Sequence, residues 1–185
     1  MTNTHINITP IIDTGVETYL PILADKIRSW LSVSTTNESL LKVSYLIMAK
    51  YDIKPNDQLG AARAIREFVA SHIPYTNDPI DVERVISPIV IAEDILNNKY
   101  GNEDCDSKAI FCTALLRAVG IEATVVFLDS NSNGVINHAM TLAYIANNAY
   151  LLEAAYPGYE FGWYPKFTKL YIVNIPQNFS LQMVG

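Results

Sequence analysis

The hydrophobic pattern changes its period once along the chain, after Gly120, and this change constrains the fold more strongly than any other feature. Before Gly120, apolar side chains recur every three or four residues, as on one face of a helix. After it come short runs rich in Val, Ile, Phe and Tyr, separated by turn residues, which is typical of strands. Helices followed by antiparallel strands predict an α+β fold, with the helices packed against one sheet.

No linker, repeat or low-complexity segment interrupts the 185 residues. We therefore expect one domain over residues 1–185, with a helical part over about 16–119 and a β-sheet part over about 122–175. The expected helices cover residues 16–31, 38–51, 88–96 and 104–119, and a further one begins within 54–57 and ends at about 72. The expected strands cover residues 122–129, 138–145, 150–155 and 169–175. In the second helix, the spacing of Leu41, Tyr45 and Met48 predicts that these side chains point inward.

The composition argues against some classes of function. Hydrophobic residues make up 50% of the chain and charged residues 17%, which suits a sizeable core. The net charge is −6 and Lys and Arg do not cluster, so neither nucleic acid nor an anionic membrane surface is an expected partner. Residues 1–10 are polar, unlike a standard signal peptide, and no apolar stretch is long enough to cross a bilayer. We expect a cytoplasmic or virion-associated protein.

The chain has two cysteines, Cys105 and Cys112. On one helix their Cα atoms would be about 10 Å apart, whereas a disulfide needs roughly 4.4–6.8 Å. They cannot pair, which favours a reducing compartment. Cys112 shares a helix face with Ala109 and Leu116, so we expect it in the core. Cys105 has polar neighbours, unlike a core cysteine. No Cys-x-x-Cys pair or clear fourth ligand is present, so we expect no zinc site.

The position of Cys105 suggests nucleophilic chemistry. It stands at the predicted start of the helix 104–119, where unpaired N–H groups stabilise negative charge, and we expect the pKa of its thiol to lie below the usual value of about 8.5. His138 begins the second predicted strand and is the expected base. Glu153, in the next strand, is the expected acid that orients the imidazole. An outward-facing edge residue is the alternative interpretation of Glu153.

The length of the loop after the second strand decides whether Glu153 reaches His138. A four-residue loop over 145–148 pairs Glu153 with Met140. Glu153 is then a diagonal neighbour of His138, with their Cα atoms roughly 7–8 Å apart. A two-residue loop over 147–148 pairs it with Leu142, too far along the strand, and a three-residue loop turns it to the other face. We expect the four-residue loop.

Several segments resemble the transglutaminase-like family. Residues 101–106 read Gly-Asn-Glu-Asp-Cys-Asp, residues 115–121 read Leu-Leu-Arg-Ala-Val-Gly-Ile, and His138 is followed by Ala139. They are similar to the G-D-C segment, the helix end and the H-A dipeptide of that family, and the similarity covers about residues 59–158. Residues 73–79 and 83–88 resemble the lead-in of a subgroup common in phage and bacterial genomes.

The resemblance implies a papain-like fold in which Cys105 is the nucleophile, His138 the base and Glu153 the third member. Two residues, Asn102 and Glu103, separate the glycine from the Asp-Cys pair, and the acid is Glu where the family usually has Asp. The implied reaction is acyl transfer through a thioester, without a cofactor. We expect a protease or amidase acting on a protein or peptide. The alternatives are a protein-glutamine transglutaminase and a non-catalytic virion or assembly module on the same fold.

A second oxyanion donor is needed beside the backbone N–H of Cys105. The loop before the helix offers Asn98, Tyr100 and Asn102. The aromatic segment 156–165, which contains Trp163, either rims the substrate cleft or covers the end of the sheet or an interface.

Overall fold

The computed structural model of the chain describes residues 20–77, 84–99 and 101–174. The helices are α1 (Leu20–Ser32), α2 (Glu38–Lys50), α3 (Gln58–His72), α4 (Pro88–Leu96) and α5 (Cys105–Ala118). The strands are β1 (Glu122–Leu128), β2 (His138–Ile145), β3 (Asn148–Leu152) and β4 (Leu170–Ile172). No helix within these ranges has the length and apolar character needed to cross a membrane.

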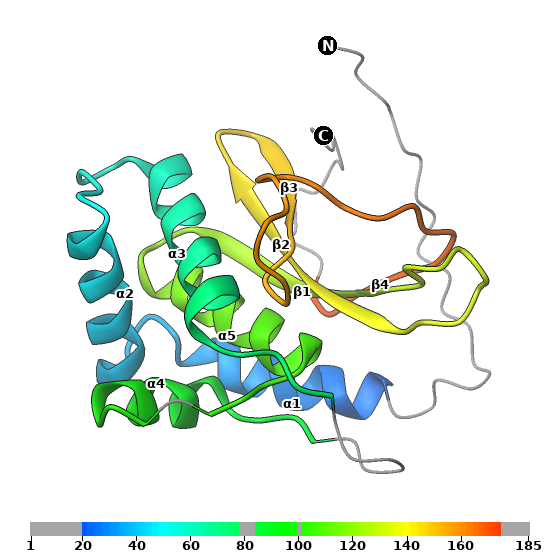
Figure 1. Cartoon of the computed structure of the whole chain (residues 1–185), viewed down its shortest axis with the longest axis horizontal. Coiled ribbons are helices and arrows are strands. Elements are labelled where there is room, and N and C mark those ends of the chain that lie inside the picture. Colours follow the sequence, from blue (N-terminus) through cyan, green and yellow to red (C-terminus); the bar gives the residue numbers. More distant parts are fainter. Residues whose placement is uncertain (1–19, 78–83, 100, 175–185) are drawn as a thin grey trace.

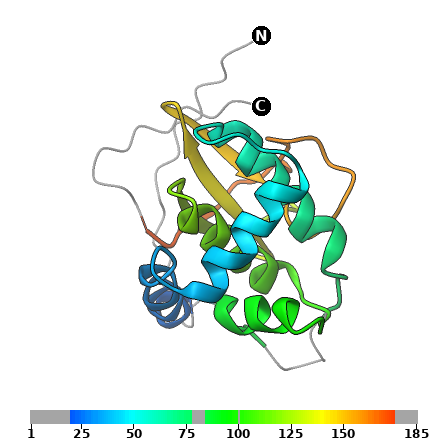
Figure 2. The ribbon, with the colours of Figure 1, turned by 90° about the vertical axis from the view of Figure 1, so that its left-hand side faces the viewer.

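Helices α1 to α4 form one layer and the sheet forms another, and α5 lies between these two layers (Figure 1). The four strands are antiparallel in the order β3-β2-β1-β4, so the first three form a meander and β4 joins the free edge of β1. Helix α5 packs against β1 and β2 on one side and against each of the other four helices on the other. Seen from the helical side, α2 crosses in front of α5 and the sheet (Figure 2). The predicted α+β fold is confirmed.

Most helices begin where the sequence predicts, because a short polar side chain caps each first turn. Asn37 accepts a hydrogen bond from the N–H of Leu40 at the start of α2. The same role is taken by Asp57 for α3, Ser87 for α4 and Asp104 for α5. At the other end of α5, Gly120 has a φ of 80°, a left-handed conformation that glycine adopts without strain.

The buried face of α2 differs from the prediction. Tyr45 is 58% exposed, and Leu41 and Met48 are only partly buried. The side chains that enter the core are those of Leu40, Val43 and Ile47. Helix α2 carries apolar residues on more than one side, so its period does not determine a face. The contacts with α3, α4 and α5 select the one that is buried.

The hairpin between β2 and β3 has the register that was predicted and a tighter turn. Ile145 pairs with Asn148, so the loop has two residues, Ala146 and Asn147, rather than four. Both have a positive φ, 49° and 66°, as a tight hairpin turn requires. The register ends with Thr141 opposite Leu152, which leaves the next residue, Glu153, opposite Met140, as predicted. Strand β3 ends before Glu153, whereas the sequence predicted a strand through residue 155.

Asp129 joins the two loops that flank the end of β1. Its carboxylate accepts hydrogen bonds from the backbone N–H groups of Gly134, Thr168 and Lys169 and from the Thr168 hydroxyl, at 2.5–2.9 Å. Burial by itself raises the pKa of Asp129, but these hydrogen bonds outweigh it and lower the pKa to about 2. The loop that leads to His138 is thereby tied to the segment before β4.

We expect Asp129→Asn to lower the free energy of unfolding at pH 7 by about 2 kcal/mol, because the ionised carboxylate stabilises the folded state. A lowered carboxyl pKa contributes stability above the unfolded-state pKa, and this contribution is lost as the pH falls from about 4 to about 2. Urea unfolding of both proteins at several pH values checks this. A difference between them that is as large at about pH 2 as at pH 7 would contradict it.

Candidate active site

Cys105 is the first residue of α5, and it lines a pocket together with His138. The Asp104 carboxylate accepts a hydrogen bond from the N–H of Ser107 at 3.1 Å and so fixes the first turn of the helix. Cys105 is half-buried. The pocket has a volume of about 260 Å³. Its walls are formed by Tyr75, Asn77, Asp104, Cys105, Asp106, Phe127, Ile136, Asn137, His138 and Ala139.

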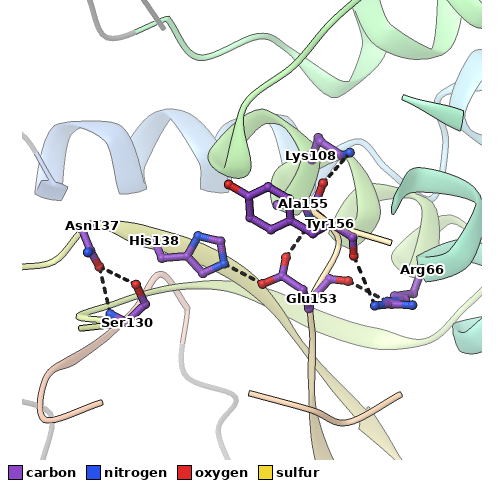
Figure 3. Close-up of polar contacts among 8 residues, drawn as sticks. All are labelled: Arg66, Lys108, Ser130, Asn137, His138, Glu153, Ala155 and Tyr156. Atoms are coloured by element: carbon purple, nitrogen blue, oxygen red, sulfur yellow. Dashed lines mark hydrogen bonds and ion pairs between the residues drawn. The ribbon is translucent and has the colours of Figure 1, made fainter. Parts of the chain in front are cut away.

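His138 and Glu153 form a buried pair (Figure 3). The imidazole Nε2 lies 2.7 Å from Oε2 of Glu153, whose residue is only 2% exposed. The other carboxylate oxygen, Oε1, accepts a hydrogen bond of 2.7 Å from the N–H of Ala155. An outward-facing Glu153 is therefore wrong. Because a carboxylate accepts hydrogen bonds, the pair favours a proton on Nε2 and leaves Nδ1 as an acceptor.

The pKa of the Cys105 thiol is shifted in the direction opposite to the prediction. Burial is the main cause, the carboxylates of Asp106, Asp104 and Glu153 act in the same direction, and together they raise the pKa to about 12. The backbone N–H of Ala139, which donates a hydrogen bond to the sulfur, lowers it but does not outweigh burial. The predicted decrease in pKa rested on the helix terminus alone. The acidic neighbours and the loss of solvent depend on how the pocket closes, and they keep the thiol neutral at pH 7.

We expect iodoacetamide to alkylate Cys105 slowly at pH 7 and faster as the pH rises, without a plateau below about pH 9. Only the thiolate reacts, and a raised pKa makes it scarce at neutral pH. Peptide mapping after timed quenching separates Cys105 from Cys112, which is fully buried and serves as an internal control. An alkylation rate that levels off near neutral pH would instead show a preformed thiolate.

Tyr75 is a pocket residue that the sequence argument missed. Its hydroxyl donates a hydrogen bond of 3.1 Å to Oδ1 of Asn77, and its ring lies 4.6 Å from the ring of Tyr156. Burial, a hydrogen bond with the Tyr156 side chain and the nearby charge of a Cys105 thiolate raise the pKa of Tyr75 well above its usual range. The hydroxyl thus stays a proton donor. The available signal was an aromatic residue within the polar, proline-bounded segment 73–79.

Three of the four predicted oxyanion or substrate residues lie away from this pocket. Asn98, Asn102 and Trp163 are not among its lining residues, and Tyr100 lies outside the described residues. Trp163 instead stacks on Tyr159, with ring centroids 3.8 Å apart. The residue of the aromatic segment that does reach the site is Tyr156, whose ring centroid is 6.5 Å from that of His138.

The structure supports no metal centre among the residues that it describes. No group of three or more His, Cys, Asp or Glu side chains in these ranges is placed to hold an ion. Cys112 has no exposed surface and lies in the core, seven residues after Cys105 on α5.

Residues 47–165, more than half of the chain, match the family described as the transglutaminase-like superfamily. The chain belongs to this superfamily. The matched range of the transglutaminase-like protein includes Cys105, His138 and Glu153. No curated protein matches the chain.

The chain is similar to several solved structures. A candidate protease from Parabacteroides distasonis is 13% identical with a TM-score of 0.53, over 72% of this chain and 26% of that protein. A candidate cysteine protease from Cytophaga hutchinsonii is 22% identical with a TM-score of 0.49, over 70% of this chain and 42% of the other. LapG from Legionella pneumophila is 19% identical with a TM-score of 0.44, over 71% and 70%. The transglutaminase-like chain thus spans less than half of the first two proteins.

Proposed function

We propose that this protein is a cysteine-dependent acyl-transfer enzyme that hydrolyses an amide bond of a protein or peptide. The observation that carries the proposal is the buried His138–Glu153 pair at 2.7 Å, in the same pocket as a thiol at a helix N-terminus. A buried carboxylate that orients an imidazole beside a nucleophile is the arrangement that acyl-transfer chemistry needs. The candidate protease from Parabacteroides distasonis, which shares the fold, is consistent with this direction.

In this mechanism Cys105 reacts as a neutral thiol with His138 as general base, because burial raises the pKa of the thiol. The sulfur forms a bond to the carbonyl carbon while its proton passes to Nδ1 of His138. The C–N bond then breaks as His138 returns that proton to the leaving amine. Water attacks the thioester, giving one proton to His138, and the C–S bond breaks to release the carboxylic acid. His138 finally returns its proton to the sulfur.

The first oxyanion donor in the proposal is the backbone N–H of Cys105, which at the first position of α5 has no partner within the helix. For the second we propose the Tyr75 hydroxyl in place of the loop residues suggested by the sequence. It lines the pocket and lies close enough to Cys105 for a thiolate there to raise its pKa. A phenol that keeps its proton can turn it from Asn77 to the developing negative charge.

We expect Tyr75→Phe to lower kcat by about 10²–10³-fold with little change in KM, which is the usual cost of losing one oxyanion donor. Tyr159→Phe is the matched control, because Tyr159 stacks on Trp163 and does not line the pocket. Steady-state kinetics with one peptide or ester substrate compare the two. A loss that appears in KM alone would make Tyr75 a binding residue and not an oxyanion donor.

The test of the enzyme itself is a trapped acyl-enzyme. Brief incubation with p-nitrophenyl acetate, followed by acid quenching and mass spectrometry, should show one acetyl group on Cys105. In His138→Ala the acetyl group should be missing, because the neutral thiol then has no base. Acetylation at the same rate in both proteins would refute the proposed mechanism.

The same thioester could be passed to an amine, which would make the protein a transglutaminase. Incubation of casein with dansylcadaverine separates the two reactions, since hydrolysis yields fragments and transfer yields fluorescent casein. We expect hydrolysis, because this compact fold and its pocket of about 260 Å³ leave little room for a second, amine-binding subsite.

One observation favours a second candidate, a non-catalytic binding module. The pKa of Cys105, raised to about 12, is unlike that of a preformed thiolate. If no acyl-enzyme forms with p-nitrophenyl acetate in the wild-type protein, this candidate replaces the enzyme.

A further inference from the structure

Lys108 is a fully buried cation next to the site, and it has no role in the proposed acyl transfer. It stands one helical turn after Cys105 on α5 and has no exposed surface. Its Nζ donates hydrogen bonds to the carbonyl oxygens of Ile73 at 2.6 Å, Ala155 at 2.8 Å and Ala70 at 3.4 Å. A buried lysine is costly unless all of its donors are used, and here each has an acceptor.

The bond to Ala155 connects Lys108 with the acid. The N–H of Ala155 donates to Oε1 of Glu153, and the carbonyl of the same residue accepts from Lys108 (Figure 3). Helix α5 therefore carries Cys105 in its first turn and, three residues later, Lys108, which is hydrogen-bonded to the segment that contains Glu153. A continuous path runs from Lys108 through Ala155 and Glu153 to His138.

Arg66 holds the same segment from the other side. Its Nε donates to the carbonyl oxygen of Glu153 at 2.6 Å, and its Nη2 lies 3.4 Å from the carbonyl oxygen of Tyr156. Arg66 belongs to α3, and two carbonyls that Lys108 binds, those of Ala70 and of the C-cap residue Ile73, come from the end of this helix. Because β3 ends at Leu152, no strand pairing fixes residues 153–156. Hydrogen bonds from the buried side chains of Arg66 and Lys108 fix this segment instead.

We propose that Lys108 is the positioning residue that fixes Glu153 against His138, by holding the Ala155 peptide in line with the nucleophile helix. This positioning role does not depend on whether the protein is an enzyme. Only the effect of Lys108 on kcat rests on the proposed function. Lys108 does not line the pocket, and the hydrogen bonds that connect it with the pair pass through Ala155 to Glu153.

The charge of Lys108 matters as well as its hydrogen bonds. Burial lowers the pKa of Lys108 to about 8, while the nearby Glu153 carboxylate raises it. The charged or titratable groups around it are Glu153 beyond β3, Arg66 on α3, and Cys105 and Cys112 on its own helix. Above about pH 8 the ammonium loses its proton and one donor, and the hold on Ala155 weakens.

Nuclear magnetic resonance of protein labelled with ¹⁵N-histidine tests the positioning. The Nε2 shift of His138, read through the carbon-bound ring protons, reports its hydrogen bond to Glu153. Glu153→Gln defines the shift of the altered pair. In Lys108→Met we expect the signal to move at least halfway to that value, whereas Ser44→Ala should leave it in place. Ser44 on α2 is the matched control. Its buried hydroxyl donates to the carbonyl of Leu115, which lies on α5 like Lys108 but near the other end of that helix from Cys105.

Two further measurements cover a Lys108→Met protein that does not fold. Lys108→Arg keeps a cation and should retain most of the wild-type shift. In the wild-type protein, raising the pH through about 8 should move the Nε2 signal in the direction of the Glu153→Gln value. A signal that stays at the wild-type position in Lys108→Met, or a signal in Lys108→Arg that moves as far as in Glu153→Gln, would overturn the positioning role.

If the protein is active, the kinetic counterpart is a loss of about tenfold or more in kcat for Lys108→Met, with KM unchanged and with partial recovery in Lys108→Arg. Full activity in Lys108→Met would also refute the proposal. An inactive wild-type protein would refute the proposed function and leave the magnetic resonance test intact.

Discussion

Replacing Cys105 by alanine is expected to abolish amide hydrolysis, with a loss in kcat of about 10⁴–10⁶-fold, because nucleophilic attack is then left to water. In triads of this kind the members act as a unit, so adding His138→Ala to Cys105→Ala should cost almost nothing more. Release of a fluorophore from a peptide amide, followed over hours, has the range to measure the residual rate. The unfolding midpoint should hardly change, since Cys105 is half-buried at a helix end and its side chain is small.

Cys112→Ala is the matched control for this prediction. Cys112 lies on the same helix with no exposed surface, so the substitution should keep activity and lower the free energy of unfolding by about 1 kcal/mol. If both cysteine variants hydrolyse the substrate at the wild-type rate, Cys105 is not a nucleophile.

Replacing Glu153 by glutamine is the second large effect that we expect. The amide can donate its own hydrogen to Nε2 and so favour the tautomer that has the proton on Nδ1, where the thiol proton must go. We expect kcat to fall by about 10²–10⁴-fold while KM changes little. The substitution also leaves the Lys108 ammonium without a counter-charge, so the free energy of unfolding should fall by about 2–4 kcal/mol. Urea unfolding and steady-state kinetics measure the two effects separately.

Glu67→Gln serves as the control for the acid. Glu67 pairs with Arg66 at 3.1 Å, but its side chain is 46% exposed, and an exposed pair adds little stability. We expect both activity and unfolding to stay near the wild-type values. A Glu153→Gln protein that keeps more than about a tenth of the wild-type kcat would show that the acid does not control the tautomer.

Local signals determined most of the predicted elements correctly. The start of α5 follows from the Asp104 cap, and its end follows from Gly120, because capping depends on a few neighbouring residues. The partnership of Glu153 with Met140 followed from counting strand positions, since side chains alternate along a strand. The turn itself was one residue tighter at each side than predicted, because Ala146 and Asn147 both adopt a left-handed conformation.

The sequence by itself determined the order of the elements, the helix that begins at Cys105 and the strand that begins at His138. Each of these rests on interactions between residues close in the chain. Only the tertiary structure decided the face of α2 that is buried, the direction of the Cys105 pKa shift and the surroundings of Tyr75 and Lys108. The reason is physical: burial and long-range hydrogen bonds come from segments far apart in sequence. Lys108, three residues after Cys105, looks like an ordinary charged helix residue until three distant carbonyls surround it.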